Sequence, residues 1–241
     1  MAGHSKWANI KHRKERVDNK RGKAFSRAVK EIAVAAQIGG PDPNANPRLR
    51  LALQKAKQIN LPNDNIDKAI KRGSGQLQGV NYEEVRYEGY GPEGVAVIVD
   101  CLTDNRNRTL TEVRTAFTKN SGSLGTDGSV SYLFRRIGQI IYAPGCAQDA
   151  VAEAAIEAGA EDIVTEDDGS IEVLTESGSF HQILEKLTEA GFASDAADMI
   201  MHPNSTVAVA DKNAEKVRKM IGALENCDDT QHIHTNAVFE D

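Results

Sequence analysis

The stretch QIIYAPGCAQDAVAEAAIEAGAEDIVTEDDGSIEVLTESGSFHQILEKLTEAGFASDAADMIMHP (139–203) decides the fold. Short runs rich in apolar and β-branched residues predict strands, and apolar residues at helical spacing predict helices between them. The strands are expected at 139–144, 162–167, 170–175 and 197–202, and the helices at 147–158 and 180–190. The resulting order, β-α-β-β-α-β, is that of the ferredoxin-like split arrangement.

The segments on either side supply further strands and helices. Residues 82–90 and 94–103 are predicted strands that a GPEG turn can join as a hairpin. Helices are expected at 109–120 and 213–224, and strands at 129–134, 205–210 and 229–237. With 94–103, these elements make a second β-α-β-β-α-β.

We therefore expect an α+β protein with two ferredoxin-like α/β domains, one inserted in the other. The inserted domain is residues 135–204, and the middle domain that receives it is residues 77–134 and 205–241. Three domains in simple sequence order are the alternative.

Residues 1–76 are expected to form a basic domain of three helices, preceded by an N-terminal arm. Between Lys23 and Ile38, apolar residues recur at helical spacing on one face: Phe25, Val29, Ile32 and Ala36. Four cations lie well round from that face and form what we call the basic ridge: Lys20, Lys23, Arg27 and Lys30. One side of this helix can pack while the other presents the ridge.

Two shorter helices complete this domain. Asn46 is expected to cap the second helix, with Pro47 at its first position. The third follows Pro62 and Asn63 and ends at Gly73.

Charge is distributed very unevenly along the chain. Residues 1–75 contain 17 Lys/Arg and 6 Asp/Glu, a net of +11, whereas residues 76–241 contain 12 and 29, a net of −17. A block of cations on an otherwise anionic protein indicates a polyanionic partner, and nucleic acid is the expected one. The acidic remainder would repel that partner, so the contact should be oriented.

The arm is the densest part of the basic block. Its candidate nucleic-acid-binding residues are Lys6, Trp7, Lys11, His12, Arg13 and Lys14, followed by Lys20, Arg21, Lys23, Arg27 and Lys30. The cations can contact phosphates, and Trp7 can stack on an unpaired base. The alternatives are a solvated helix face and a tryptophan that pins the arm to the helices.

A second candidate anion site is TDNRNRT (103–109), between a strand and a helix. Asn107 or Thr109 can cap the helix, which places Arg106 and Arg108 beside its positive end. A local turn that bridges Asp104 to these arginines is the alternative. The glycine-rich stretch 120–129 lacks the P-loop pattern and is interpreted as a hairpin loop.

The segment 137–204 holds 14 Asp/Glu and a single Lys/Arg, Lys186. We expect it to stay away from a phosphate backbone. It is either a solvated surface that maintains solubility or a surface that docks onto a basic protein.

Other classes of function find little support. His232 and His234 share a strand face near Cys227 and Asp228, but no fourth ligand at zinc-site spacing accompanies them, so we expect no metal and no cofactor. No hydrolase or metalloprotease motif points to an enzyme. Three widely spaced cysteines favour a cytoplasmic protein, and the lack of a long apolar stretch favours one without a membrane segment. We expect a monomer, because no apolar stripe is left over for a partner.

Four stretches in the same order resemble the YebC/PmpR family. They are MAGHSKWANIKHRK (1–14), LALQKAKQINLPNDNIDKAIKRGSG (51–75), YEGYGPEGVAVIVDCLTDNRNRT (87–109) and GSVSYLF (128–134). The resemblance covers essentially the whole chain and implies a helical domain followed by two α/β domains. It also implies a bacterial cytoplasmic regulator of transcription that binds DNA. The family includes the mitochondrial translational activator of cytochrome oxidase subunit I, and since some relatives act on translation at the ribosome, the alternative is a translation factor that binds ribosomal RNA or the ribosome.

Overall fold

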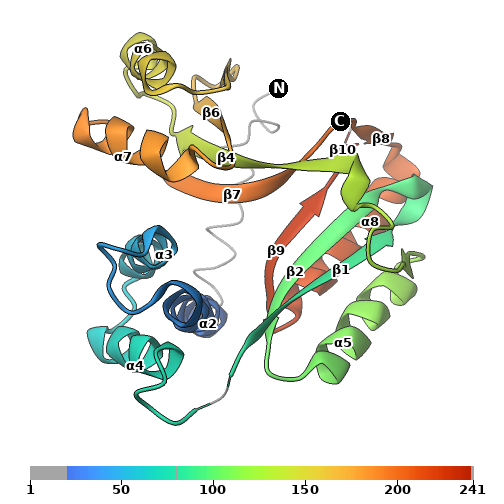
Figure 1. Ribbon diagram of the computed structural model, residues 1–241. Coiled ribbons are helices and arrows are strands. Elements are labelled where there is room, and N and C mark those ends of the chain that lie inside the picture. The colour runs from blue at the N-terminus through green and yellow to red at the C-terminus, as the bar shows by residue number, and fades with distance from the viewer. Residues whose placement is uncertain (1–20, 80, 240–241) are drawn as a thin grey trace. The chain divides into compact units, whose positions relative to one another are not determined.

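A computed structural model describes residues 21–79 and 81–239 (Figure 1). The chain divides into two compact units. One, here called the acidic unit, contains Arg135–His202, and the main unit contains Lys20–Phe134 together with Pro203–Asp241. No helix in the described ranges is long and apolar enough to cross a bilayer.

The main unit begins with a helical domain, as the sequence predicted. Its described helices are α2 (Arg21–Gly39), α3 (Pro47–Gln58) and α4 (Asn63–Gly73). Their apolar faces meet in one core whose fully buried members include Ile32, Leu49 and Ala69. Because the three faces close on one another, the domain has its own core.

Asn46 joins two of these helices. Its side-chain oxygen accepts the Leu49 N–H at 3.0 Å, so the predicted cap of α3, with Pro47 at the first position, is confirmed. Its amide nitrogen donates to the carbonyls of Ala35 and Gly40, both at 2.8 Å. One buried side chain therefore starts α3 and holds it to the end of α2.

Two backbone features fix how α4 packs. Asn60 adopts a left-handed conformation with φ 55°, and the Leu61 N–H donates to the Ala56 carbonyl at 2.9 Å, which closes α3. At the end of α4, a Cβ on Gly73 would lie 2.1 Å from the Ala33 carbonyl oxygen. Glycine is therefore required where α4 meets α2.

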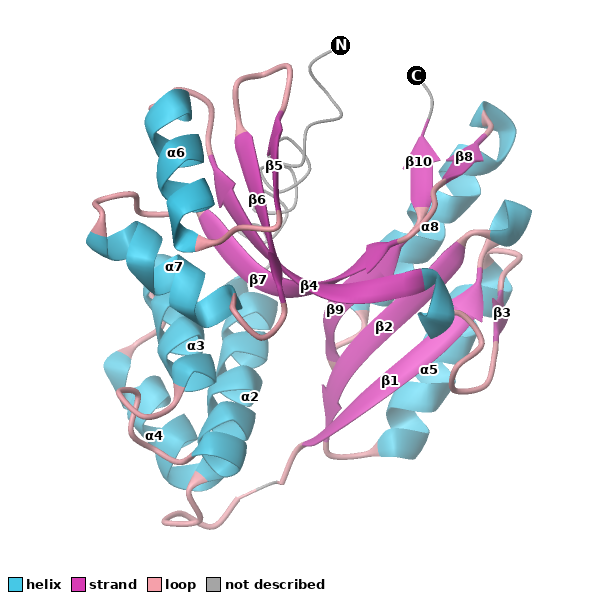
Figure 2. Cartoon of the chain, turned by 45° about the horizontal axis from the view of Figure 1, so that its top comes forward, coloured by secondary structure: helices cyan, strands magenta, loops and turns pink. Residues whose placement is uncertain are grey.

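The middle part of the main unit is a sheet with strand order β3-β1-β2-β9. Its elements are β1 (Glu83–Tyr90), β2 (Ala96–Thr103), β3 (Ser123–Leu124), β9 (Thr230–Thr235), α5 (Arg106–Lys119) and α8 (Asp211–Asn226). The predicted hairpin is confirmed: β1 and β2 pair from Glu83↔Thr103 to Tyr90↔Ala96, around a 3-10 turn, η1 (Pro92–Gly94). Both helices pack on one face of the sheet, where they share an apolar core with it (Figure 2).

The predicted second β-α-β-β-α-β arrangement is wrong. Residues expected as a strand at 129–134 instead form a 3-10 turn, η2 (Ser131–Leu133). The cause is Glu88, 5% exposed, whose carboxylate accepts the N–H groups of Val130 and Ser131 at 2.8 Å each and so removes them from strand pairing. The segment expected as the strand 205–210 contributes only β8 (Val207–Val209), which pairs in parallel with β10 (Ala237–Phe239) outside the main sheet.

The acidic unit has the predicted order of elements. They are β4 (Phe134–Tyr142), α6 (Gln148–Ala158), β5 (Asp162–Thr165), β6 (Ile171–Glu176), α7 (Phe180–Glu189) and β7 (Ala196–Pro203). The sheet order is β5-β6-β4-β7. Side chains from both helices, such as Val151, Phe180 and Leu187, are buried, so α6 and α7 pack through their apolar faces.

Candidate nucleic-acid interface

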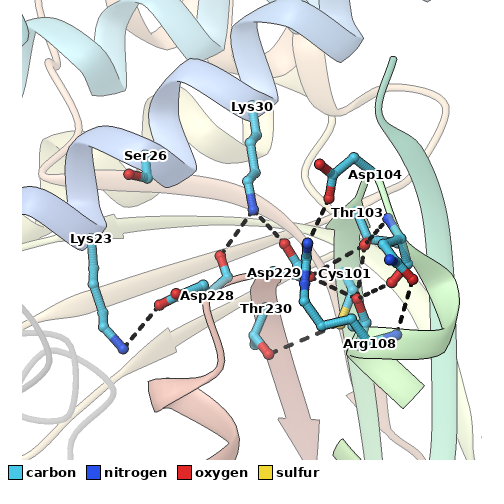
Figure 3. Close-up of polar contacts among 12 residues, drawn as sticks. Lys23, Ser26, Lys30, Cys101, Thr103, Asp104, Arg108, Asp228, Asp229 and Thr230 are labelled. Carbon is cyan, nitrogen blue, oxygen red and sulfur yellow. Dashed lines mark hydrogen bonds and ion pairs between the residues drawn. The ribbon is translucent and has the colours of Figure 1, made fainter. Parts of the chain in front are cut away.

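The described part of the basic ridge lies against the end of α8 and the turn that follows it (Figure 3). Lys23 donates to the Asn226 carbonyl, and its ammonium lies 3.1 Å from the Asp228 carboxylate. Arg27 donates to the Glu225 carbonyl at 2.5 Å. The last carbonyls of a helix carry partial negative charge, so cations are favoured at this end.

Lys30 makes the most buried of these contacts. Its ammonium, with the side chain 12% exposed, lies 2.5 Å from an Asp229 carboxylate oxygen and 3.1 Å from the Asp228 carbonyl oxygen. The same nitrogen stands 5.6 Å from the centre of the Tyr82 ring. Burial removes water from the Lys30 ammonium, and the ion pair with Asp229 and the hydrogen bond to the Asp228 carbonyl replace it.

Asp229 is the centre of the polar cluster. Its carboxylate is 1% exposed and accepts from Lys30 on one oxygen and from Arg108 at 2.8 Å and Thr109 at 2.7 Å on the other, with Thr103 at 3.2 Å. Burial alone would raise the pKa of Asp229, but the hydrogen bonds from Lys30, Arg108 and Thr109 outweigh it and lower the pKa to about 2. The group is therefore an anion at any physiological pH.

The predicted anion site at 103–109 takes part in this cluster. Arg108 bridges Asp104, at 2.6 Å, and Asp229, while a contact of Arg106 and Arg108 with nucleic acid stays a prediction. Arg106, 61% exposed, lies 3.3 Å from Glu83. The carboxylates of Asp229 and Asp104 raise the pKa of Arg108, which is therefore a cation.

Neither Asn107 nor Thr109 caps α5. The cap is Asn105, whose side chain accepts the Arg108 N–H at 3.1 Å. Asn105 has extended backbone angles, φ −149° and ψ 93°, which a cap requires, whereas the two predicted residues lie inside the helix.

A cleft of about 640 Å³ opens beside these contacts. Its lining carries both signs of charge, with cations from α2 and α5 and carboxylates from the turn before α5, from α5 itself and from the turn after α8. The lining residues are Gly22, Lys23, Ser26, Lys30, Tyr82, Asp104, Arg108, Glu112, Asp228 and Asp229. Three cations and four carboxylates line the cleft, so its lining is of mixed charge.

Several other cations of the helical domain lie outside the basic ridge. Arg48 forms ion pairs with Glu31 at 2.7 Å and Glu84 at 2.8 Å. A second group is exposed and forms no ion pair with the residues that the structure describes; it consists of Lys57 on α3 and Lys68, Lys71 and Arg72 on α4. We call Lys68, Lys71 and Arg72, which recur at i, i+3 and i+4, the α4 cations.

Several predicted nucleic-acid-binding residues lie outside the part of the chain that the structure describes. Lys6, Trp7, Lys11, His12, Arg13, Lys14 and Lys20 lie outside the described residues, and Arg21 is described only as the first residue of α2. Their role stays a prediction.

The histidine pair belongs to the sheet. His232 and His234 stack at 6.1 Å between ring centres, and His234 lies 3.3 Å from the carboxylate of Asp100. Within residues 21–79 and 81–239, no three His, Cys, Asp or Glu side chains are grouped so that they could hold a metal ion.

Sequence reasoning missed Asp228 and Asp229 as partners of the ridge. They are separated from Lys30 by almost 200 residues, and the periodicity of α2 reveals its polar face but not what that face meets. It also omitted the α4 cations, although their helical spacing was a usable signal.

Comparison of the sequence with known protein families gives two matches that together cover most of the chain. The profile described as the TACO1/YebC protein N-terminal domain matches residues 5–76, and that of the TACO1/YebC second and third domain matches residues 82–237. The chain belongs to the TACO1/YebC family. The resemblance noted in the sequence is thereby confirmed.

Relatives extend over the whole chain. A protein of Polynucleobacter asymbioticus is 56% identical over 99% of this chain and 100% of its own length, and one of Cupriavidus taiwanensis is 56% identical over 100% of both. Both are named probable transcriptional regulatory proteins. The crystal structure of the conserved hypothetical protein Aq1575 of Aquifex aeolicus is similar with a TM-score of 0.86, at 44% identity over 93% of each chain. The TACO1/YebC chain described here is thus an α+β protein with a helical domain followed by two α/β sheets.

Proposed function

We propose that this protein is a non-enzymatic regulator of gene expression that binds nucleic acid through its basic N-terminal domain. The observation that carries the proposal is the net charge of +11 on residues 1–75 of a chain whose remainder carries −17. The names of its relatives agree with a role in transcription, which makes DNA the first candidate ligand.

The α4 cations and the N-terminal arm are the proposed phosphate contacts. Lys68, Lys71 and Arg72 are exposed on one helix, where they can follow a backbone of phosphates. Such contacts position the protein on the nucleic acid without reading its sequence. Base readout would have to come from elsewhere, and Trp7 in the arm is our candidate for stacking on a base.

Several finer expectations stand with this proposal. They are the domain boundaries 1–76, 77–134 with 205–241, and 135–204, the ferredoxin-like type of the 135–204 domain, a cytoplasmic location and a monomeric state. The element order of the acidic unit supports the ferredoxin-like type.

An RNA- or ribosome-binding translation factor is the second candidate. The observation that favours it is the acidic unit, because 14 Asp/Glu against one Lys within 137–204 suit a basic protein surface such as ribosomal proteins present. Crosslinking in cells, followed by sequencing of the bound nucleic acid, separates the two. Reads at promoters would rule out the ribosome, and reads on ribosomal RNA would rule out the promoter.

Binding in solution tests the shared chemistry. With roughly 6 phosphates neutralised, affinity for a 20-base-pair duplex should fall on the order of a thousandfold between 50 and 200 mM salt. Replacing the α4 cations together by Gln should weaken binding and reduce the slope of log affinity against log salt by about 2 to 3. Replacing Lys11, Arg13 and Lys14 together by Ala tests the arm in the same way.

A matched control removes the same charge elsewhere. Lys212, Lys216 and Lys219 are exposed on α8, and their joint replacement by Gln should leave the slope close to that of the unchanged protein. Equal losses from the two triple variants would show that net charge, and not the helical domain, determines binding.

A further inference from the structure

The basic ridge already has an anionic partner within the chain. Lys23, Arg27 and Lys30 follow one another along α2, and each donates to oxygens of the segment Glu225–Asp229. We call this set of contacts the latch. In it a row of cations faces a row of negatively polarised oxygens.

The chemistry of the latch is that of a phosphate contact. Segment 225–229 offers two helix-end carbonyls and two carboxylates in succession, spaced along the ridge. Charge-assisted hydrogen bonds from Lys and Arg to such oxygens are the bonds that these residues form with nucleic-acid backbones. The segment therefore occupies the ridge as a phosphate backbone would.

The contact is polar and can be reversed. The apolar core of the helical domain is built from α2, α3, α4 and Leu61, and the core of the middle sheet from other residues. Within residues 21–79 and 81–239, the two cores share no member. Docking by charged side chains is weakened by salt and by competing ions, unlike docking through an apolar core.

Opening the latch leaves no isolated buried charge. Asp229 loses Lys30 but keeps Arg108 at 2.8 Å and Thr109 at 2.7 Å, both from the middle part of the chain. The released side chains of Lys23, Arg27 and Lys30 enter water, where their charges are solvated. Both the closed and the open arrangement therefore satisfy their charges, which a two-state element requires.

We propose that segment 225–229 is an intramolecular competitor for nucleic acid: it covers Lys23, Arg27 and Lys30 in the closed state, and a phosphate backbone displaces it. This inference rests on the proposed function, because it concerns how the same basic domain is regulated. It predicts that the resting protein binds below its full capacity, since only the open fraction offers the ridge.

Two variants open the latch by different amounts. Asp228→Asn with Asp229→Asn removes both carboxylates. Asp228→Asn alone removes the exposed one, and its loss should cost little stability because the side chain is 77% exposed. If nine-tenths of the resting molecules are closed, the double variant should bind a fluorescent 20-base-pair duplex about tenfold more tightly. The single variant should gain less.

The control has the same charge change away from the latch. Asp127→Asn with Glu215→Gln neutralises two exposed carboxylates of the main unit, and like the latch variant it releases a lysine, because Glu215 pairs with Lys219 at 2.7 Å. It should gain much less affinity than the double latch variant.

A direct readout of opening uses a pair of spin labels. Gln58→Cys on α3 and Thr115→Cys on α5 place labels on two exposed helix positions across the latch, with Cys146→Ser removing the most accessible native thiol. The distance between labels should lengthen and broaden when duplex is added, and should do so at 0.5 M salt without duplex.

Each outcome bears on the inference. Tighter binding by the latch variants than by the control, together with a longer label distance in the complex, supports it. Duplex binding with an unchanged label distance, or equal gains from latch variant and control, would overturn the latch and leave the proposed function intact. A duplex bound by neither the unchanged protein nor the open variant would overturn both.

Discussion

Asp229 offers the sharpest test of what stabilises the main unit. Its carboxylate is 1% exposed, and its pKa is lowered from the ordinary 3.8 to about 2 because its donors outweigh the effect of burial. That lowering corresponds to about 2 kcal/mol in favour of the folded state at neutral pH. The carboxylate must lose its charge for this contribution to disappear.

The direction of the pH dependence follows from the lowered pKa. A group with a lower pKa in the folded state contributes its full stability above its unfolded pKa, here 3.8, and loses it as the pH falls towards about 2. Asp229→Asn should therefore lower the free energy of unfolding by about 2 kcal/mol at pH 7. The difference from the unchanged protein should shrink between about pH 4 and pH 2.

The assay should report on the main unit alone. Urea-dependent hydrogen exchange, followed by mass spectrometry in peptides from β2 and β9, measures the opening of the sheet that carries the cluster. Asp228→Asn is the matched comparison, since its side chain is 77% exposed and should cost less than about 1 kcal/mol. Equal costs for the two variants, or a cost for Asp229→Asn that persists unchanged at pH 2, would refute a charged hub at Asp229.

Three further predictions concern the core and the cysteines. Gly73→Ala should lower the free energy of unfolding of the helical domain by more than about 2 kcal/mol, because the new Cβ would meet the Ala33 carbonyl. Thermal unfolding followed by circular dichroism measures this loss, and an unchanged midpoint would contradict the close approach of α4 to α2. Asn46→Ala should lower the free energy of unfolding by about 3 kcal/mol, because it loses the cap and the hydrogen bonds to the Ala35 and Gly40 carbonyls. Asn46→Ser keeps the cap and should restore about 1 kcal/mol, so identical denaturation midpoints for the two variants would contradict the cap. Burial raises the pKa of Cys101 to about 12, so at pH 8 iodoacetamide should alkylate Cys146 well before Cys101, as intact mass and peptide mapping would show.

Local signals in the sequence predicted the helical domain and the acidic unit well. Asn46 and Pro47 mark the start of α3 through chemistry that acts within a few residues, and Gly73 marks the end of α4. The β-α-β-β-α-β order of the acidic unit follows from changes of apolar period along one continuous segment. Such signals need no knowledge of distant contacts.

The middle sheet was harder to predict because its contacts are distant in sequence. The carboxylate of Glu88 turns residues 131–133 away from a strand by accepting N–H groups 42 and 43 residues later. The partner of β8 is β10, and no periodicity in three-residue strands specifies that pairing. The candidate site shows the same limit, since Lys30 could be identified as a ridge cation but its acceptor Asp229 could not.

The junction between the two units has a consequence for the order of folding. The chain leaves the main unit after Phe134 and returns at Pro203, and beside this junction the Asn204 N–H donates to the Leu133 carbonyl at 2.8 Å. Strand β2 pairs with β1 on one side and β9 on the other, and β9 emerges from the ribosome only after the whole of Arg135–His202 has been made. During synthesis, the acidic unit can fold from one continuous stretch before β9 is available to pair with β2. The last 40 or so residues therefore determine when the middle sheet is complete.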